Sequence, residues 1–148
     1  MASRLRGTAL SAAPRSPGAD FRFELRVYWE DTDAGGVVFY ANYLKFFERA
    51  RTEWLRALGV EQSALRRDEG AIFVVGETRV RYLLPARLDD WLSLSVDVAE
   101  LGRASLLVDQ RCRRGDTLLA EGSIRIGCVD AGTFRPRRIP NSILERLA

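Results

Sequence analysis

The sequence predicts an α+β fold in which a curved antiparallel sheet surrounds one long helix. Three observations lead to this prediction. Apolar residues recur at helical spacing over one long stretch, an extended run precedes that stretch, and several long strand-like runs follow it. This order of elements is typical of α+β proteins. The 148 residues, 47% of them hydrophobic, are enough for a single domain with one core.

The first element is an extended run over residues 21–29. Apolar and polar residues alternate along it, which predicts a strand with one buried face. That face carries Phe21, Phe23, Leu25, Val27 and Trp29.

The helix is predicted from about Tyr40 to Leu58, and Gly59 is expected to end it. No other long helix is apparent. At about 100° per residue, its apolar residues fall on one stripe. The stripe consists of Tyr43, Phe47, Ala50, Trp54 and Leu58.

Two charged residues interrupt the apolar arc of this helix. Arg51 projects into the arc and Glu48 lies at its border, and their spacing of three residues allows them to pair. Two interpretations remain open. The pair is either a structural ion pair at the rim of the core or part of a surface that faces a ligand.

The remaining elements are four strands and a hairpin turn at Gly115-Asp116. In this hairpin we expect Cys112 opposite Leu119, too far from Cys128 for a disulfide. Two small buried thiols are typical of a reducing cytoplasm. The strands are expected at Ile72–Leu84, Trp91–Leu101, Ala104–Arg113 and Leu118–Val129.

The first 20 residues form an N-terminal tail of low hydrophobicity, which we interpret as a disordered extension rather than a transit peptide. The formal net charge is +3, and the tail carries most of it, through three arginines against Asp20. A nearly neutral remainder does not favour nucleic acid as a partner. No apolar run approaches the ~18 residues of a membrane span.

The chain contains no histidine, which excludes several kinds of hydrolytic site. Ser-His-Asp and Cys-His arrangements and the HExxH zinc site all need an imidazole. Two cysteines without histidine also make a zinc site improbable. Acid–base chemistry therefore falls first to the carboxylates.

The segment from Asp31 to Asn42 is the most informative for function. Asp33 lies in a glycine-rich loop just before the helix, where unpaired N–H groups and the positive end of the helix dipole gather. Asp31 or Asp33 could simply cap or complement the helix. A calcium loop is excluded, because Val37 and Asn42 stand where oxygen ligands are required.

The chemistry that remains is acyl transfer. Backbone N–H groups at the helix start would polarise a carbonyl oxygen, and Asp33 would act beside it as nucleophile or general base. A carboxylate is a weak nucleophile, so an activated acyl group such as a thioester is a better target than an amide.

A longer pattern includes this segment and consists of Arg26-Val27, Thr32-Asp33 and Gly36-Val37-Val38-Phe39-Tyr40-Ala41-Asn42-Tyr43. It resembles the active-site signature of the 4-hydroxybenzoyl-CoA thioesterase-like hotdog family. The helix residues 46–55 and the segments 82–90 and 135–140 are similar to the Tol–Pal-associated acyl-CoA thioesterase subfamily. The resemblance covers about residues 21–143.

The resemblance implies a single hotdog thioesterase domain over residues 21–148, whose subunits join sheets edge to edge as dimers and often as tetramers. It implies an active site at the dimer interface. There Asp33 matches the catalytic carboxylate, and Tyr40 matches the residue whose backbone N–H polarises the carbonyl. Tol–Pal-type members commonly carry histidine at the Tyr40 position, so any imidazole-assisted step is absent from this chain.

The resemblance also implies substrate contacts. Glu48 matches a helix position that faces the far end of the acyl group. Arg103, with Ser105 beside it, resembles a basic position used for coenzyme A phosphates, and three further arginines are weaker candidates. These are Arg135, Arg137 and Arg138.

The sequence therefore predicts a cytoplasmic acyl-CoA thioester hydrolase that needs no metal or separate cofactor. Acyl groups carried on an acyl carrier protein are a second possible substrate. The alternative is a non-catalytic module that binds acyl-CoA or acyl carrier protein on the same fold. A hotdog dehydratase is disfavoured because that reaction usually depends on histidine.

Overall fold

The computed structural model describes residues 20–148, so residues 1–19 of the predicted tail lie outside the described residues. The described part is a six-stranded antiparallel sheet with three α-helices and one short 3-10 turn, η1. The elements are β1 (Arg22–Arg26), η1 (Trp29–Asp31), α2 (Asn42–Ala57), α3 (Gln62–Glu69), β2 (Ala71–Tyr82), β3 (Trp91–Ser95), β4 (Asp97–Leu101), β5 (Ser105–Arg114), β6 (Thr117–Asp130) and α4 (Asn141–Leu147).

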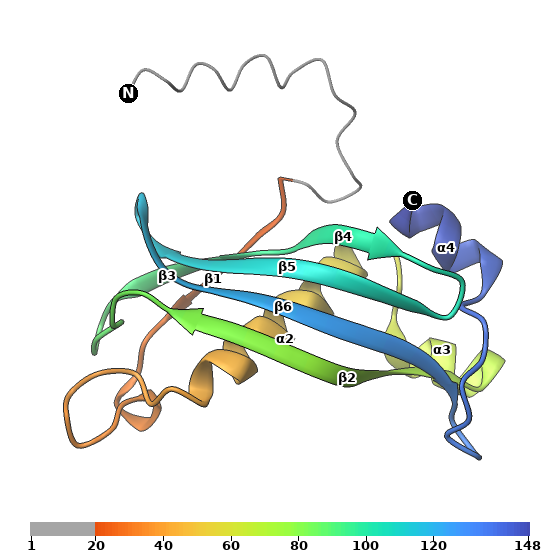
Figure 1. The fold of residues 1–148 in the computed structure, drawn as a ribbon, viewed down its shortest axis with the longest axis horizontal. Helices are drawn as coiled ribbons and strands as arrows, with labels where there is room; N and C mark the ends of the chain where they lie inside the picture. The colour runs from red at the N-terminus through yellow and green to blue at the C-terminus, as the bar shows by residue number, and fades with distance from the viewer. Residues whose placement is uncertain (1–19) are drawn as a thin grey trace, which may run out of the picture.

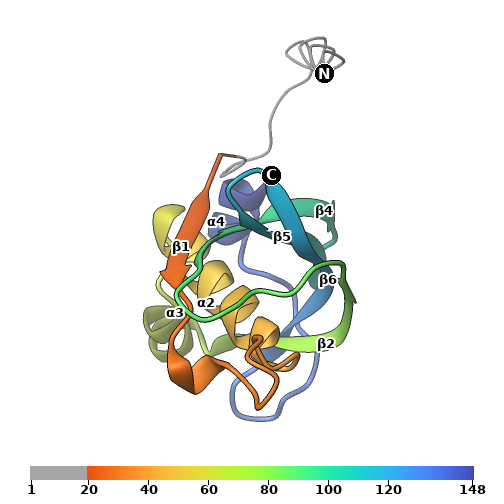
Figure 2. The same ribbon diagram turned by 90° about the vertical axis from the view of Figure 1, so that its left-hand side faces the viewer.

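The sheet has the strand order β1-β3-β5-β6-β2, and β4 also pairs with β5. In Figure 1 α2 crosses one face of the sheet, and the end-on view in Figure 2 shows the sheet curving around it. The predicted α+β architecture of a helix wrapped by an antiparallel sheet is confirmed. Strands β1 and β2 are the two edges of the sheet order.

Helix α2 forms the centre of the core. It begins at Asn42 and ends at Ala57, and Gly59 follows with φ +86°, a conformation that glycine adopts without steric cost. Most of the predicted stripe is confirmed, while Leu58 is only partly buried. The buried residues of the helix are Tyr43, Phe46, Phe47, Ala50, Trp54 and Leu55.

Strands β5 and β6 supply the floor beneath the helix. Their side chains alternate between buried and partly exposed, as expected when one face of a sheet packs against a helix. Gly122 of β6 lies where the helix comes closest. A Cβ atom there would stand 3.2 Å from Cε2 of Phe47. The absence of a side chain at Gly122 therefore allows the Phe47 ring to lie directly on the sheet.

Three details of the predicted elements are wrong. The run 91–101 is divided at Val96 into β3 and β4, and β4 is an outer strand beside β5. Trp29 does not share the buried face of β1, because the chain turns into η1 there and leaves the indole 80% exposed. The short helices α3 and α4 were not predicted, since eight and seven residues give little periodic signal.

The predicted register of the β5–β6 hairpin is also wrong by one residue. A β-bulge between Cys112 and Arg113 places Cys112 opposite Ala120 rather than Leu119. Cys128 lies eight residues further along β6, about 26 Å away at 3.3 Å per residue. Both thiols are free and buried, as predicted.

Candidate active site

Asp33 lies in a tight loop between η1 and α2. An antiparallel bridge joins Thr32 to Val38, and the N–H of Asp33 donates to the Val37 oxygen at 2.9 Å. Gly36 completes the turn with φ +81°, and its N–H donates to the Asp33 backbone oxygen at 3.0 Å. The Asp33 carboxylate is exposed in this chain, and its Oδ1 accepts from Gly35 N–H at 2.8 Å. The loop therefore fixes the direction of the carboxylate.

The backbone of Asp31 joins this loop to the start of α2. Its oxygen accepts from the Phe39 N–H and from the Asn42 side-chain amide, both at 2.9 Å. Its carboxylate accepts from the Tyr28 N–H at 2.8 Å. Helix α2 has no side-chain capping hydrogen bond. Asp31 thus shapes the η1 turn, and neither Asp31 nor Asp33 caps the helix.

The start of α2 presents donors without acceptors. Within residues 20–148, the N–H groups of Tyr40 and Ala41 donate no hydrogen bond. Free N–H groups and the helix dipole favour negative charge at this point. The Tyr40 side chain is 64% exposed. The expected donor, the Tyr40 N–H, therefore has no acceptor among the described residues.

Two tyrosines that sequence reasoning did not assign to the site surround the helix start. The hydroxyl of Tyr82 donates to the Tyr40 backbone oxygen at 2.9 Å. The hydroxyl of the buried Tyr43 accepts from the Ala86 N–H at 3.1 Å, and burial raises the pKa of Tyr43. Tyr82 lies in a segment that resembles the Tol–Pal-type proteins. No local sequence pattern predicts its contact with Tyr40, because the two residues are 42 positions apart in the chain.

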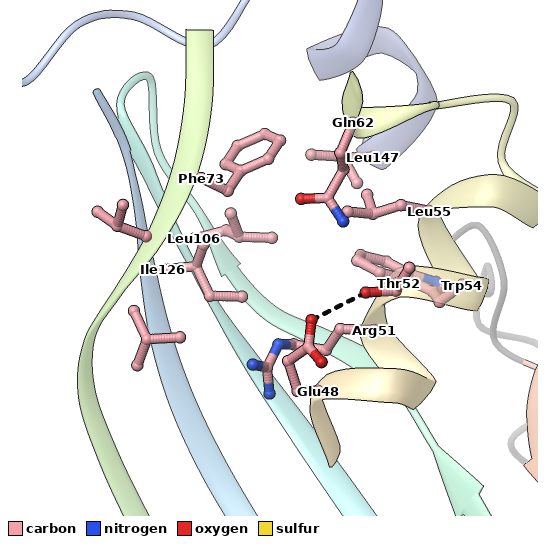
Figure 3. Close-up of a pocket in the computed structure, with 12 residues that line it drawn as sticks. Glu48, Arg51, Thr52, Trp54, Leu55, Gln62, Phe73, Leu106, Ile126 and Leu147 are labelled. Carbon is pink, nitrogen blue, oxygen red and sulfur yellow. Dashed lines mark hydrogen bonds between the residues drawn. The ribbon is translucent and has the colours of Figure 1, made fainter. Parts of the chain in front are cut away.

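A pocket that is open to solvent lies between α2 and β2 (Figure 3). Glu48 and Arg51 both line it, and no ion pair joins them within residues 20–148, although the Glu48 charge partly offsets the lowering of the Arg51 pKa by burial. The Thr52 hydroxyl donates to Glu48 Oε2 at 3.1 Å, and Arg51 donates to Gln110 Oε1 at 3.0 Å. The apolar lining comprises Trp54, Leu55, Phe73, Val74, Val75, Leu106, Ile126 and Leu147.

Gln110 is fully buried beneath this pocket. Its amide nitrogen donates to the Phe47 oxygen at 3.0 Å and to the Ser95 oxygen at 3.4 Å. The side chain therefore joins α2, β3 and β5 while its oxygen holds the Arg51 guanidinium. The pattern of apolar and polar residues along β5 does not predict which residues the buried Gln110 contacts, because its partners belong to other elements.

Arg103 and Ser105 lie at the other end of the sheet. The connection between β4 and β5 lies at one end of Figure 1 and the loop before α2 at the opposite end. Ser105 pairs with Gly127 of β6, whereas Tyr82 pairs with Ala120. Seven residues of β6 separate these levels, about 23 Å. One chain does not bring Asp33 and Arg103 together.

The weaker arginine candidates lie near Arg103. The segment after β6 folds back on that strand through a bridge between Val129 and Pro136. The N–H of Ile139 then donates to the Arg103 oxygen at 2.8 Å. Arg137 donates to the Glu69 backbone oxygen at 2.8 Å.

No helix in residues 20–148 combines the length and apolar character needed to cross a bilayer.

The profile of the thioesterase-like superfamily matches residues 27–147. The chain belongs to this superfamily. Acyl-CoA thioester hydrolase YbgC of Escherichia coli is 46% identical over 125 residues, which are 84% of this chain and 92% of the relative. Acyl-CoA thioesterase YbgC of Haemophilus influenzae is 43% identical over 123 residues, 83% of this chain and 90% of the relative.

A solved structure shows the same fold. The probable thioesterase from Bartonella henselae superimposes with a TM-score of 0.77 at 34% identity, over 80% of this chain and 98% of the other. The predicted thioesterase-like hotdog family is therefore confirmed, as is the likeness to the Tol–Pal-associated subfamily that the YbgC relatives represent. In this chain the fold sets α2 against a curved sheet, and the Asp33 loop adjoins the start of that helix.

Proposed function

We propose that this superfamily member hydrolyses acyl-CoA thioesters to a free acid and coenzyme A. The observation that carries the proposal is the connection of the Asp33 loop to the start of α2, where two backbone N–H groups have no acceptor within the described residues. The names of the YbgC relatives support the same activity.

Two routes are consistent with this geometry. In both, the N–H of Tyr40 donates a hydrogen bond to the thioester oxygen and stabilises the negative charge that develops there. With Asp33 as general base, water loses a proton to the carboxylate and adds to the carbonyl carbon, and the C–S bond then breaks. With Asp33 as nucleophile, its oxygen displaces the coenzyme A thiolate, and water hydrolyses the resulting anhydride. The thiolate takes up a proton in either case.

The distance between the two ends of the sheet favours a homodimer as the active unit. Among the described strands, β2 is an edge strand. Its Tyr82 end lies beside the helix start, and its Ala71 end lies beside the Arg103 connection. Antiparallel pairing of the β2 strands of two subunits would place the Tyr82 end of one strand next to the Ala71 end of the other. We propose that Arg103 and Ser105 of one subunit hold coenzyme A phosphates for Asp33 of its partner. Two such dimers would form the predicted tetramer.

The pocket between α2 and β2 is proposed to receive the acyl group. Its apolar walls suit a hydrocarbon or aromatic group, and Glu48 supplies a polar contact at one end. An acyl group delivered on an acyl carrier protein would enter the same pocket. The two buried free thiols fit a reducing compartment, and we propose the cytoplasm.

The test is thiol release from acetyl-, medium-chain, long-chain and aromatic CoA esters by the protein and by Asp33→Asn. We expect at least one ester to be hydrolysed and Asp33→Asn to lower kcat by roughly 10³-fold or more, because the amide neither accepts the proton nor forms the anhydride. The Asp33→Asn protein should retain its circular dichroism spectrum and melting temperature.

The alternative function is a binding module without turnover. Binding of every ester without thiol release would establish that alternative and exclude the hydrolase. Hydrolysis by Asp33→Asn at the rate of the unchanged protein would remove Asp33 from the mechanism.

A further inference from the structure

Tyr82 connects the last position of β2 to the start of α2. Its hydroxyl donates to the backbone oxygen of Tyr40 at 2.9 Å. Its ring lies edge-on to the Tyr40 ring, with centroids 6.3 Å apart, and to the Tyr43 ring at 5.3 Å. One side chain therefore contacts the helix start through a hydrogen bond and two aromatic contacts.

The hydrogen bond acts on a peptide group that carries a free donor. The Tyr40 oxygen and the Ala41 N–H belong to the same peptide, which is trans. A hydrogen bond accepted at the oxygen polarises that peptide and strengthens its N–H as a donor. It also fixes the plane of the peptide, and with it the direction of the N–H.

We propose that Tyr82 is a positioning residue for the thioester carbonyl, acting through the 40–41 peptide. Its hydroxyl holds the peptide so that Ala41 N–H joins Tyr40 N–H as a second donor to the carbonyl oxygen. The inference rests on the proposed function, since it needs a carbonyl bound at the helix start. It goes further by adding a second donor and the side chain that directs it.

The protonation state of Tyr82 suits this role. Burial, and then the neighbouring Tyr40, raise the pKa of the Tyr82 hydroxyl above its ordinary value. The hydroxyl therefore keeps its proton at neutral pH and remains a donor. An oxyanion that accepts from the Ala41 N–H shifts electron density in the peptide toward the Tyr40 oxygen, so the hydrogen bond from Tyr82 to that oxygen strengthens as charge develops.

A role in packing alone is the competing explanation. The ring contacts with Tyr40 and Tyr43 persist without the hydroxyl, so a packing role predicts that phenylalanine replaces Tyr82 without loss. A positioning role predicts that kcat falls when the hydroxyl is removed, and that kcat depends on the strength of the hydroxyl as a donor.

The experiment is steady-state hydrolysis of the best CoA ester by Tyr82→Phe. We expect kcat to fall about tenfold, the effect of losing one hydrogen bond that acts in the transition state, with KM within twofold. Tyr28→Phe removes a hydroxyl from an exposed side chain, and as the control it should leave kcat unchanged. Melting temperature and circular dichroism should show that both variants are folded.

A second substitution changes only the donor strength of the hydroxyl at position 82. Incorporation of 3-fluorotyrosine at position 82 keeps the ring and its shape but makes a stronger donor, so kcat should rise above that of the unchanged protein. Wild-type kcat in Tyr82→Phe, or a change confined to KM, would overturn the role of Tyr82 and leave the proposed function intact. Absence of hydrolysis by the unchanged protein would overturn both.

Discussion

Asp33 is held by a turn rather than by a neighbouring charge. Its Oδ1 accepts from the Gly35 N–H, and the described residues offer it no ion pair. A carboxylate of this kind keeps a free oxygen for a proton or a carbon atom. The direction of that oxygen depends on the backbone of the Asp33–Gly36 turn, which Gly35 and Gly36 shape.

Gly36 tests this dependence. Its φ of +81° strains any residue with a Cβ, while no atom lies within 4 Å of a Cβ built there. We expect Gly36→Ala to lower the free energy of unfolding by about 1–2 kcal/mol and to reduce kcat by shifting Asp33. Urea unfolding and thiol release measure the two effects.

Gly127→Ala is the matched control, because its site is equally open and has no positive φ. It should leave kcat unchanged. If Gly36→Ala had the stability and kcat of the unchanged protein, the loop would not direct the carboxylate.

At the scale of elements, Gln110 is the polar link between helix α2 and the sheet. It is the fully buried polar residue of the described core, and it joins Arg51 of α2 to the oxygens of Phe47 and Ser95. Such a link fixes the rotation of α2 about its axis. The same rotation determines that Glu48 faces the pocket.

We expect Gln110→Leu to lower the free energy of unfolding by about 2–3 kcal/mol. The change leaves the partly buried Arg51 and a backbone oxygen without their partner, and such groups are costly to leave unsatisfied. Urea unfolding measures the loss.

Thr52→Ala is its control, because it removes a hydrogen bond to the exposed Glu48, and it should change stability by about 0.5 kcal/mol or less. Equal stability of Gln110→Leu and the unchanged protein would show that Gln110 does not anchor the helix.

At the scale of the whole molecule, the position of the substrate contacts decides how many chains make one site. Asp33 and Arg103 belong to opposite ends of the sheet, about 23 Å apart along β6. The free β2 edge offers antiparallel pairing with a second copy, which would bring those ends together.

Mixing two defective subunits tests this arrangement. Asp33→Asn and Arg103→Ala should each hydrolyse subsaturating CoA ester poorly, the second through a raised KM. When they are co-expressed, a heterodimer has one site with both native residues, so random pairing should restore about a quarter of wild-type activity. Thiol release by the mixture measures this, and activity no higher than the mean of the two parents would place both residues in one subunit.

The sequence was sufficient to predict what depends on local spacing. Neighbouring residues were enough to predict four features: the apolar stripe of α2, the glycine at its end, the strands β5 and β6, and the acid in the turn before the helix. The lack of histidine made the carboxylates the first candidates for acid–base chemistry before any fold was known. The signature from Arg26 to Tyr43 then indicated the superfamily, which the profile match confirmed.

Only the tertiary structure decided which distant groups meet. Two hydrogen bonds join residues that are far apart in the chain, one from Arg51 to Gln110 and one from Tyr82 to Tyr40. The bulge beside Cys112 shifts the register of the hairpin by one residue. The same holds for the separation of Asp33 from Arg103. Local composition sets the elements, because backbone and side-chain preferences act over a few residues. The contacts between elements depend on how all of them pack at once, so no short segment contains them.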